Sequence, residues 1–277
     1  MMALDVHSLT RIVLKVPGAR TALKWVTSRW GEGRVYAIRS GPMKGLRWRR
    51  ENRFPYWYHT GRYEPEISAL IAVKLRPGDV YWDLGAHAGY HTLQGARAVG
   101  PSGRVLAVEP DPSVCRSLRE QLATNGLTNV TVVEAAVSDE AGSTRLVVRA
   151  ADDTRGSALD SVHNPAIRNS RGLKLEVSST TLDALAARFP SPHLLKMDIE
   201  GSEAAALRAG GQLWEGSRRP WRILLSYHGD ESRAFCQRFL LARGYALEVN
   251  EGLGSTFLAT DRASRLTPPG KDQADGP

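Results

Sequence analysis

One short stretch of this chain, residues 80–92, constrains the fold more than any other part of the sequence. It begins with a largely apolar run that predicts a buried strand, continues with a turn containing Gly85 and Gly89, and ends in the start of a helix. Glycine permits close approaches that other residues cannot make, so we expect both glycines where a side chain would block a ligand. Free N–H groups at a helix start favour carboxylate or phosphate groups. The stretch therefore predicts the first strand-to-helix turn of a nucleotide-type fold, with its ligand above the strand's carboxyl end.

Strand and helix patterns alternate through the chain. Strands are predicted at residues 79–85, 104–109, 130–137, 144–149, 173–179, 193–198, 221–227, 245–250 and 255–259. Helices are predicted at residues 67–75, 90–99, 110–125, 203–209 and 231–243, with another starting at residues 180–183. This order predicts an α/β fold: a parallel sheet with helices on both faces and one antiparallel edge strand from a C-terminal hairpin.

The basic character of the chain is concentrated at its N-terminus. The first 53 residues hold twelve of the 37 Lys and Arg residues and three of the 29 Asp and Glu residues, so the remainder is close to neutral. Two amphipathic helices are predicted before residue 31, followed by short strands at 35–38 and 46–49. The helices either cap the main domain with a solvated basic face or dock peripherally on a membrane or an anionic partner.

Composition divides the chain into three parts: a basic extension or cap at residues 1–53, a main domain at 54–262 and a disordered tail at 263–277. Residues 52–66 are dense in aromatics and predict either a lid over the substrate or a segment packed on the sheet. Residues 150–172 are polar and without periodicity, which predicts a surface loop.

Cysteine usage and hydropathy predict a soluble cytoplasmic protein. Cys115 and Cys236 stand far apart without metal-ligand spacing, which favours free thiols in a reducing compartment. No apolar run approaches the roughly 20 residues needed to cross a bilayer. The first residues also lack the continuous apolar core of a signal peptide.

Chemically useful residues fall at four predicted strand ends. Asp83 ends the first strand, and Glu109 ends the second, where its two acceptor oxygens suit the hydroxyls of a ribose. Ala136 lies at the third, where small residues either admit a flat adenine or simply pack in the core. Asp198 ends the fourth. The turn at 85–89 lacks the G-x-G-x-x-G pattern that cradles a pyrophosphate, which favours S-adenosylmethionine over a nicotinamide dinucleotide.

Six runs resemble, in order, the motifs of the FkbM-type methyltransferases, a class I S-adenosylmethionine-dependent family. They are residues 83–92, 108–112, 118–125, 136–139, 181–183 and 196–203. The resemblance implies a Rossmann-like seven-stranded methyltransferase sheet, S-adenosylmethionine as cofactor, and O-methylation of a sugar, glycolipid or natural product. The cofactor-binding residues expected from the strand ends and the resemblance are Asp83, Gly85, Ala86, His87, Gly89, Glu109, Pro110, Ala136 and Asp198.

Two positions depart from that family pattern. His87 stands where the family usually has Asn, and Ser226 stands where an acid often ends the fifth strand. A binding-only protein without turnover therefore stays open as an alternative. His59 and His91 are weaker candidates for lining an acceptor pocket.

A hydroxyl acceptor needs a base or a metal to become nucleophilic. Asp198 and His228 are the predicted catalytic residues, because both follow strand ends that face one crevice and histidine titrates near neutral pH. Glu200 and Glu203 together with Asp198 would suit a divalent cation, but acids are also common at a helix start. We predict no metal.

The expected acceptor is a small molecule or a glycan, without a nucleic-acid partner. A nicotinamide-dependent oxidoreductase is one rival class, and a nucleic-acid-binding or nucleic-acid-modifying protein, suggested by the basic N-terminal segment, is another. Residues 198–201 do not form the polar–Pro–aromatic run that base-flipping methyltransferases often carry at the fourth strand.

Overall fold

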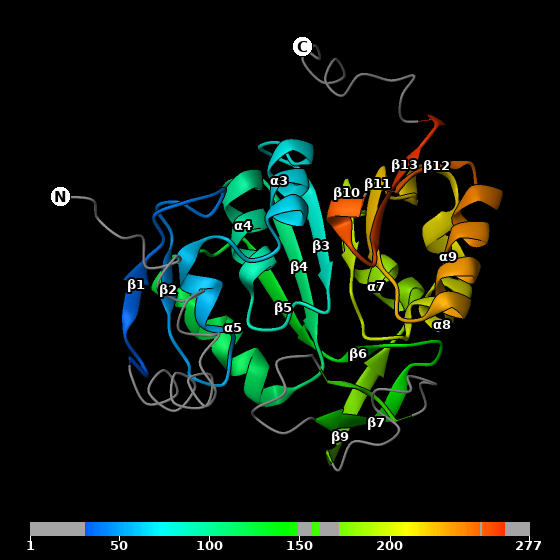
Figure 1. Ribbon diagram of the computed structural model, residues 1–277. Coiled ribbons are helices and arrows are strands. Elements are labelled where there is room, and N and C mark those ends of the chain that lie inside the picture. Colours follow the sequence, from blue (N-terminus) through cyan, green and yellow to red (C-terminus); the bar gives the residue numbers. More distant parts are fainter. Residues whose placement is uncertain (1–30, 149–156, 161–171, 250, 264–277) are drawn as a thin grey trace, which may run out of the picture.

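The computed structural model describes residues 31–148, 157–160, 172–249 and 251–263. Its centre is a seven-stranded sheet (Figure 1). In spatial order the strands are β12 (Tyr245–Val249), β13 (Thr256–Asp261), β11 (Arg222–Ser226), β10 (Leu194–Met197), β3 (Val80–Leu84), β4 (Arg104–Glu109) and β5 (Val130–Glu134). The expected α/β sheet with a C-terminal antiparallel hairpin is confirmed. The antiparallel strand was misplaced, however: β13 lies inside the sheet, because β12 pairs with its far side.

Helices cover both faces of this sheet. One side carries α3 (Pro65–Lys74), α4 (Tyr90–Val99) and α5 (Pro112–Thr124), and the other carries α7 (Leu182–Arg188), α8 (Glu203–Ala209) and α9 (Asp230–Ala242) (Figure 1). Successive side chains of a strand point to opposite faces, so Tyr81 of β3 packs with the α3 and α4 side while Trp82 packs with the α7 to α9 side. Both side chains are fully buried. Burial on both faces explains why this strand is an apolar run without alternation.

A second, four-stranded sheet lies beside the carboxyl end of β5. Its order is β6 (Ala136–Val137), β9 (Leu173–Thr180), β7 (Gly142–Val148) and β8 (Ala158–Leu159) (Figure 1). The single strand expected at residues 130–137 is therefore wrong, since the chain leaves the main sheet after Glu134 and pairs with β9. The prediction of a loop over residues 150–172 is wrong for Ala158–Leu159, which form β8. Two residues are too few to show the alternation of apolar and polar side chains that predicts a strand. The rest of that loop, apart from residues 157–160 and 172, lies outside the described residues.

The described part of the basic extension packs against α5. Strands β1 (Val35–Ala37) and β2 (Arg47–Arg49) pair antiparallel, close to where they were expected. The backbone N–H of Arg47 donates to Oδ1 of Asn125 at 2.7 Å, and that of Arg49 donates to Oε1 of Gln121 at 2.9 Å. Between them Trp48 is buried. The helices expected before residue 31 and the tail beyond residue 263 lie outside the described residues.

The described residues also form four short 3-10 helices: η1 (Tyr56–Thr60), η2 (Gln212–Trp214), η3 (Gly216–Arg218) and η4 (Glu251–Leu253). The first falls in the aromatic segment 52–66. Within the ranges that the structure describes, no helix has the length and hydropathy needed to cross a bilayer.

Candidate active site

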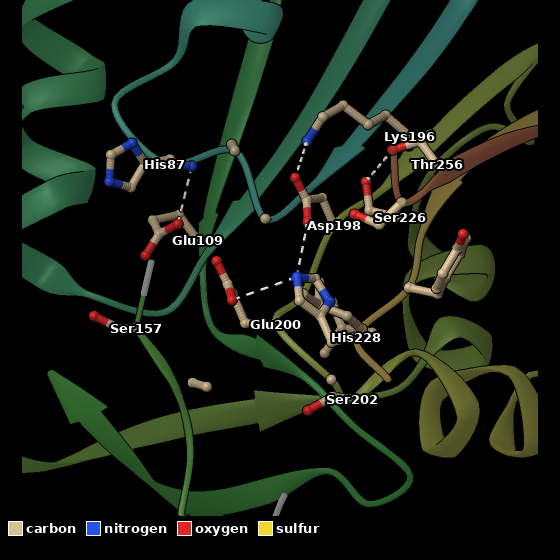
Figure 2. A pocket seen from close by; sticks show the side chains of 18 of the residues that line it. His87, Glu109, Ser157, Lys196, Asp198, Glu200, Ser202, Ser226, His228 and Thr256 are labelled. Carbon is tan, nitrogen blue, oxygen red and sulfur yellow. Dashed lines mark hydrogen bonds and ion pairs between the residues drawn. The ribbon is translucent and has the colours of Figure 1, made fainter. Parts of the chain in front are cut away.

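A pocket of about 1530 Å³ opens at the carboxyl ends of the parallel strands (Figure 2). Its wall includes Gly85 after β3, Glu109 at the end of β4, Asp198 after β10 and Ser226 at the end of β11. Strand order reverses between β3 and β10, and ligands of open α/β sheets bind at such a reversal. Pockets for one small molecule measure roughly 300–1,000 Å³. This pocket is therefore large enough for two ligands side by side.

The turn at residues 85–89 is held by contacts within the protein. The N–H groups of Gly85 and Ala86 both donate to the carbonyl oxygen of Val108, at 2.9 and 3.0 Å. A Cβ on Gly85 would lie 1.8 Å from the carbonyl oxygen of Asp198, and one on Gly89 would lie 2.3 Å from Leu118. Both glycines have positive φ. We expected these glycines to leave room for a ligand, but the reason is wrong, because the missing side chains would strike Asp198, just after β10, and Leu118 of α5.

His87 occupies the left-handed region of backbone space, with φ of 49°. Its N–H donates to Oε2 of Glu109 at 3.0 Å, and its Nδ1 lies 3.2 Å from the Tyr58 hydroxyl. Asn and His are both enriched several-fold in this region among non-glycine residues. The backbone therefore explains why His can stand where the related family usually has Asn. Removal from bulk water, with help from the charges of Lys196 and Arg53, lowers the pKa of His87 to about 4, so its ring is neutral.

Glu109 presents a buried carboxylate to the pocket (Figure 2). Oε2 accepts the N–H of His87, and Oε1 accepts the N–H of Asp111 at 3.0 Å. Burial raises the pKa of Glu109 to about 7, although these two donors oppose the shift. Each carboxylate oxygen has a second acceptor direction. The side chain can therefore accept the hydroxyl groups of a ribose without giving up its place in the turn.

Asp83 does not line the pocket. It is fully buried, accepts the hydroxyl of Thr92 at 2.6 Å, and lies 3.4 Å from Nζ of Lys196. Lys196 in turn lies 3.7 Å from Oδ2 of Asp198 (Figure 2). Burial alone would lower the pKa of Lys196, but Asp83, Asp198 and Glu64 raise it above its ordinary value. Asp83 thus acts on the pocket through the charged Lys196. Lys196 was not among the predicted site residues, although a lysine inside an otherwise apolar strand could have indicated its role.

His228 is surrounded by carboxylates. Its Nδ1 lies 2.9 Å from Oε1 of Glu203. Figure 2 shows its Nε2 beside Glu200, at 3.4 Å, and Asp198, at 3.9 Å. Glu203 is fully buried and also accepts the N–H of Gly201 at 3.0 Å, which fixes the turn before α8. Burial lowers the pKa of His228, yet the hydrogen bond and charge of Glu203 and the two other carboxylates raise it to about 9. His228 is therefore an imidazolium at neutral pH.

Residues 52–66 supply another wall of the pocket. Phe54, Tyr58 and Tyr63 line it, and the Tyr58 ring packs edge-on against that of Trp48 with 5.1 Å between ring centroids. The segment therefore both packs on the extension and borders the pocket. Glu64, which was not predicted, lies 2.8 Å from Nε2 of His91 and also lines the pocket.

The remaining predicted residues can now be placed. Gly85, Ala86, His87, Glu109, Pro110, Ala136, Asp198 and His228 line one pocket, together with His91. Gly89, Asp83 and His59 do not line it; the ring of His59 instead packs near that of Tyr36 at 4.9 Å. Ser226 stands where the related family often has an acid, and its Oγ lies 2.9 Å from Oγ1 of Thr256. In the part of the chain that the structure describes, no group of three or more His, Cys, Asp and Glu residues has the arrangement of a metal site.

The chain is similar to a known protein family and, over short segments, to two curated proteins. The sequence model of the methyltransferase FkbM domain matches residues 83–247, more than half of the chain. The protein-L-isoaspartate O-methyltransferase of Ignicoccus hospitalis is 40% identical over 62 residues, which are 22% of this chain and 29% of that protein. The arsenite methyltransferase of Halobacterium salinarum is 38% identical over 56 residues, 20% of this chain and 14% of that protein. The chain spans less than a third of the length of these two curated relatives.

A solved structure with the same description is also similar. The FkbM methyltransferase of Methylobacillus flagellatus shares 16% identity and a TM-score of 0.45, over 88% of this chain and 60% of that one. The match of the family model confirms the resemblance drawn from the motifs.

Proposed function

The chain belongs to the methyltransferase FkbM domain family, and on this premise we propose that it transfers the methyl group of S-adenosylmethionine to a hydroxyl of a sugar, glycolipid or natural-product acceptor. The observation that carries the proposal is the position of Glu109. Its carboxylate ends β4, borders the turn at 85–89 and faces a pocket at the reversal of strand order. This is where a ribose is held in folds of this kind.

The pocket residues fit this cofactor better than a dinucleotide. The turn has no three-glycine pattern for a pyrophosphate, and Asp198 places a carboxylate on the wall of the same pocket. A carboxylate suits the ammonium and sulfonium charges of S-adenosylmethionine and opposes the negative charges of a dinucleotide. Ala135 and Ala136 line the pocket next to Glu109 and leave space for a flat base.

Methyl transfer requires donor and acceptor to be aligned in one line, so most of the catalytic work is positioning. When bound, S-adenosylmethionine supplies an electrophilic methyl group on a positively charged sulfur. Asp198 is our assignment for the group that takes the proton of the acceptor hydroxyl as its oxygen forms the new bond to carbon. His228 holds its charge between Asp198 and Glu200 and thereby orients Asp198 toward the acceptor. We therefore do not assign the role of base to His228, although it was one of the two predicted catalytic residues. Its imidazole ring already carries a second proton and cannot accept another.

Product analysis tests the proposal. The purified protein is incubated with S-adenosylmethionine and a panel of hydroxyl-bearing sugars, glycolipids and polyketide-type natural products, and both S-adenosylhomocysteine and a methyl ether are assayed. We expect turnover with at least one hydroxyl acceptor, and loss of that turnover in Asp198→Asn and His228→Asn variants that still bind S-adenosylhomocysteine. Full activity of both variants would remove these residues from the mechanism. Methylation at nitrogen with none at oxygen would refute the acceptor class.

A further inference from the structure

Glu64 has an unusual backbone for its position. It is the residue before the first turn of α3, with φ of 42° and ψ of 63°, and its side chain makes no hydrogen bond to that helix end. Non-glycine residues in the left-handed region are strained by about 1–3 kcal/mol and cluster at functional sites. A glutamate here would ordinarily help the helix start. The strain instead directs its carboxylate toward the pocket that Glu109 and Asp198 also line.

The Glu64 carboxylate is held beside the turn that follows β3. Its Oε2 lies 2.8 Å from Nε2 of His91, which belongs to the first turn of α4 and is buried. Tyr63 packs near the ring of the same histidine at 5.9 Å between centroids. Although burial opposes it, the contact with His91 and the charge of Lys196 lower the pKa of Glu64 to about 2. The group is therefore an anion at neutral pH.

The Glu64 carboxylate is accessible from the pocket. Its side chain keeps 31% of its exposure although it lies against the buried His91, and it lines the pocket together with Asp198. A cationic group of a ligand can therefore reach this carboxylate and form a charge-assisted hydrogen bond with it.

We propose that the Glu64 carboxylate binds the α-ammonium group of the methionyl half of S-adenosylmethionine, with His91 as the positioning residue that holds it. The inference rests on the proposed function, since it assigns one contact of that cofactor. His87, in the turn at 85–89, donates its N–H to Glu109, and His91, in the first turn of α4 directly after that turn, contacts Glu64. The nucleoside half thus lies at Glu109, and the amino acid half extends toward Glu64.

The contact between Glu64 and the α-ammonium group can be tested by measuring the binding of two ligands to two proteins. The ligands are S-adenosylhomocysteine and its deamino analogue, in which hydrogen replaces the α-amino group, and the proteins are the wild type and Glu64→Gln. Calorimetry gives four dissociation constants. Because a hydrogen bond to a charged group contributes about 1.5–3 kcal/mol, the preference of the wild type for the amino ligand should fall about tenfold in Glu64→Gln. The deamino analogue should bind both proteins equally, and Glu215→Gln, an exposed charge-matched control, should behave as the wild type.

The outcomes separate this inference from the proposed function. If the wild type binds S-adenosylhomocysteine and Glu64→Gln shows the same preference for the amino ligand, the ammonium contact is wrong, but the proposed cofactor stands. If the wild type binds neither ligand, both the ammonium contact and the proposed function are wrong. Equal weakening of both ligands in Glu64→Gln also contradicts the contact, since it indicates a general structural effect. His91→Phe should lose part of the ligand preference, whereas His91→Gln, which retains a donor, should keep most of it.

Discussion

The hydroxyl of Tyr58 lies 3.2 Å from Nδ1 of His87. This contact joins the aromatic segment 52–66 to the turn that follows β3, and it places the residue that departs from the family pattern at the junction. The backbone of His87, rather than its charge, is what the site requires, because φ is positive and the ring is neutral.

His87→Asn should therefore be tolerated and His87→Val should not. Asparagine adopts left-handed backbone readily, whereas a β-branched residue there is a genuine outlier, so we expect a loss of about 1–3 kcal/mol in unfolding free energy for valine and under about 0.5 kcal/mol for asparagine. Denaturant unfolding of both variants measures this. Equal losses would show that the imidazole ring itself, and not the backbone, sets the requirement.

Gly85→Ala should destabilise the protein through a clash with the backbone just after β10. The new Cβ would lie 1.8 Å from the carbonyl oxygen of Asp198. Gly126→Ala is a matched control, since Gly126 also has positive φ but no atom within 4 Å of the added Cβ. The control should cost about 1 kcal/mol from the backbone alone, and Gly85→Ala at least about 2 kcal/mol more. Similar thermal and denaturant midpoints for the two variants would contradict the close approach.

Cofactor affinity should increase as pH rises through about 7. The pKa of Glu109 is raised to about 7 by burial, and the ionised carboxylate accepts hydroxyl donors that the protonated form accepts less well. Hydroxyl binding favours the anion, so complex formation releases a proton near neutral pH. Titration of S-adenosylhomocysteine between pH 6 and pH 8 should show this rise in the wild type and a flat profile in Glu109→Gln. A rise of the same size in the variant would assign the effect to another group.

Turnover should fall as pH rises through about 9. The imidazolium of His228 orients Asp198 in our account, and its pKa is raised to about 9. Loss of the ring proton above that pH removes the positive charge between Asp198 and Glu200. The profile of kcat against pH decides between the two roles: a rate that increases up to about pH 9 would make His228 the base, and Asp198 would then be only its partner.

The sequence predicted the layers of the fold because its buried strands and amphipathic helices carry strong local patterns. Tyr81 and Trp82 lie in a run that is apolar on both faces, and the strand at 80–84 was found without difficulty. β8 was missed since two residues have no period. The departure of the chain from the main sheet after Glu134 was missed since no Gly or Pro marks a break between residues 130 and 137.

The candidate site was predictable only where a residue ends a strand. Glu109, Asp198 and His228 were found this way, and all three line the pocket. Sequence position does not show the direction of a side chain, so Asp83 was expected to meet the ligand and instead faces Lys196. Glu64 was missed because the irregular segment 52–66 gives no indication of which side chains turn inward.

Calorimetric titration with S-adenosylhomocysteine is the most direct test of the central claim that this pocket binds the methyl donor through Glu109. We expect wild-type protein to bind with a roughly micromolar dissociation constant, about −8 kcal/mol, and Glu109→Ala to bind at least about tenfold more weakly. NAD and NADH should produce no heat of binding. Binding of a nicotinamide dinucleotide with none of S-adenosylhomocysteine would contradict the account, and unchanged affinity in Glu109→Ala would remove that residue from the site.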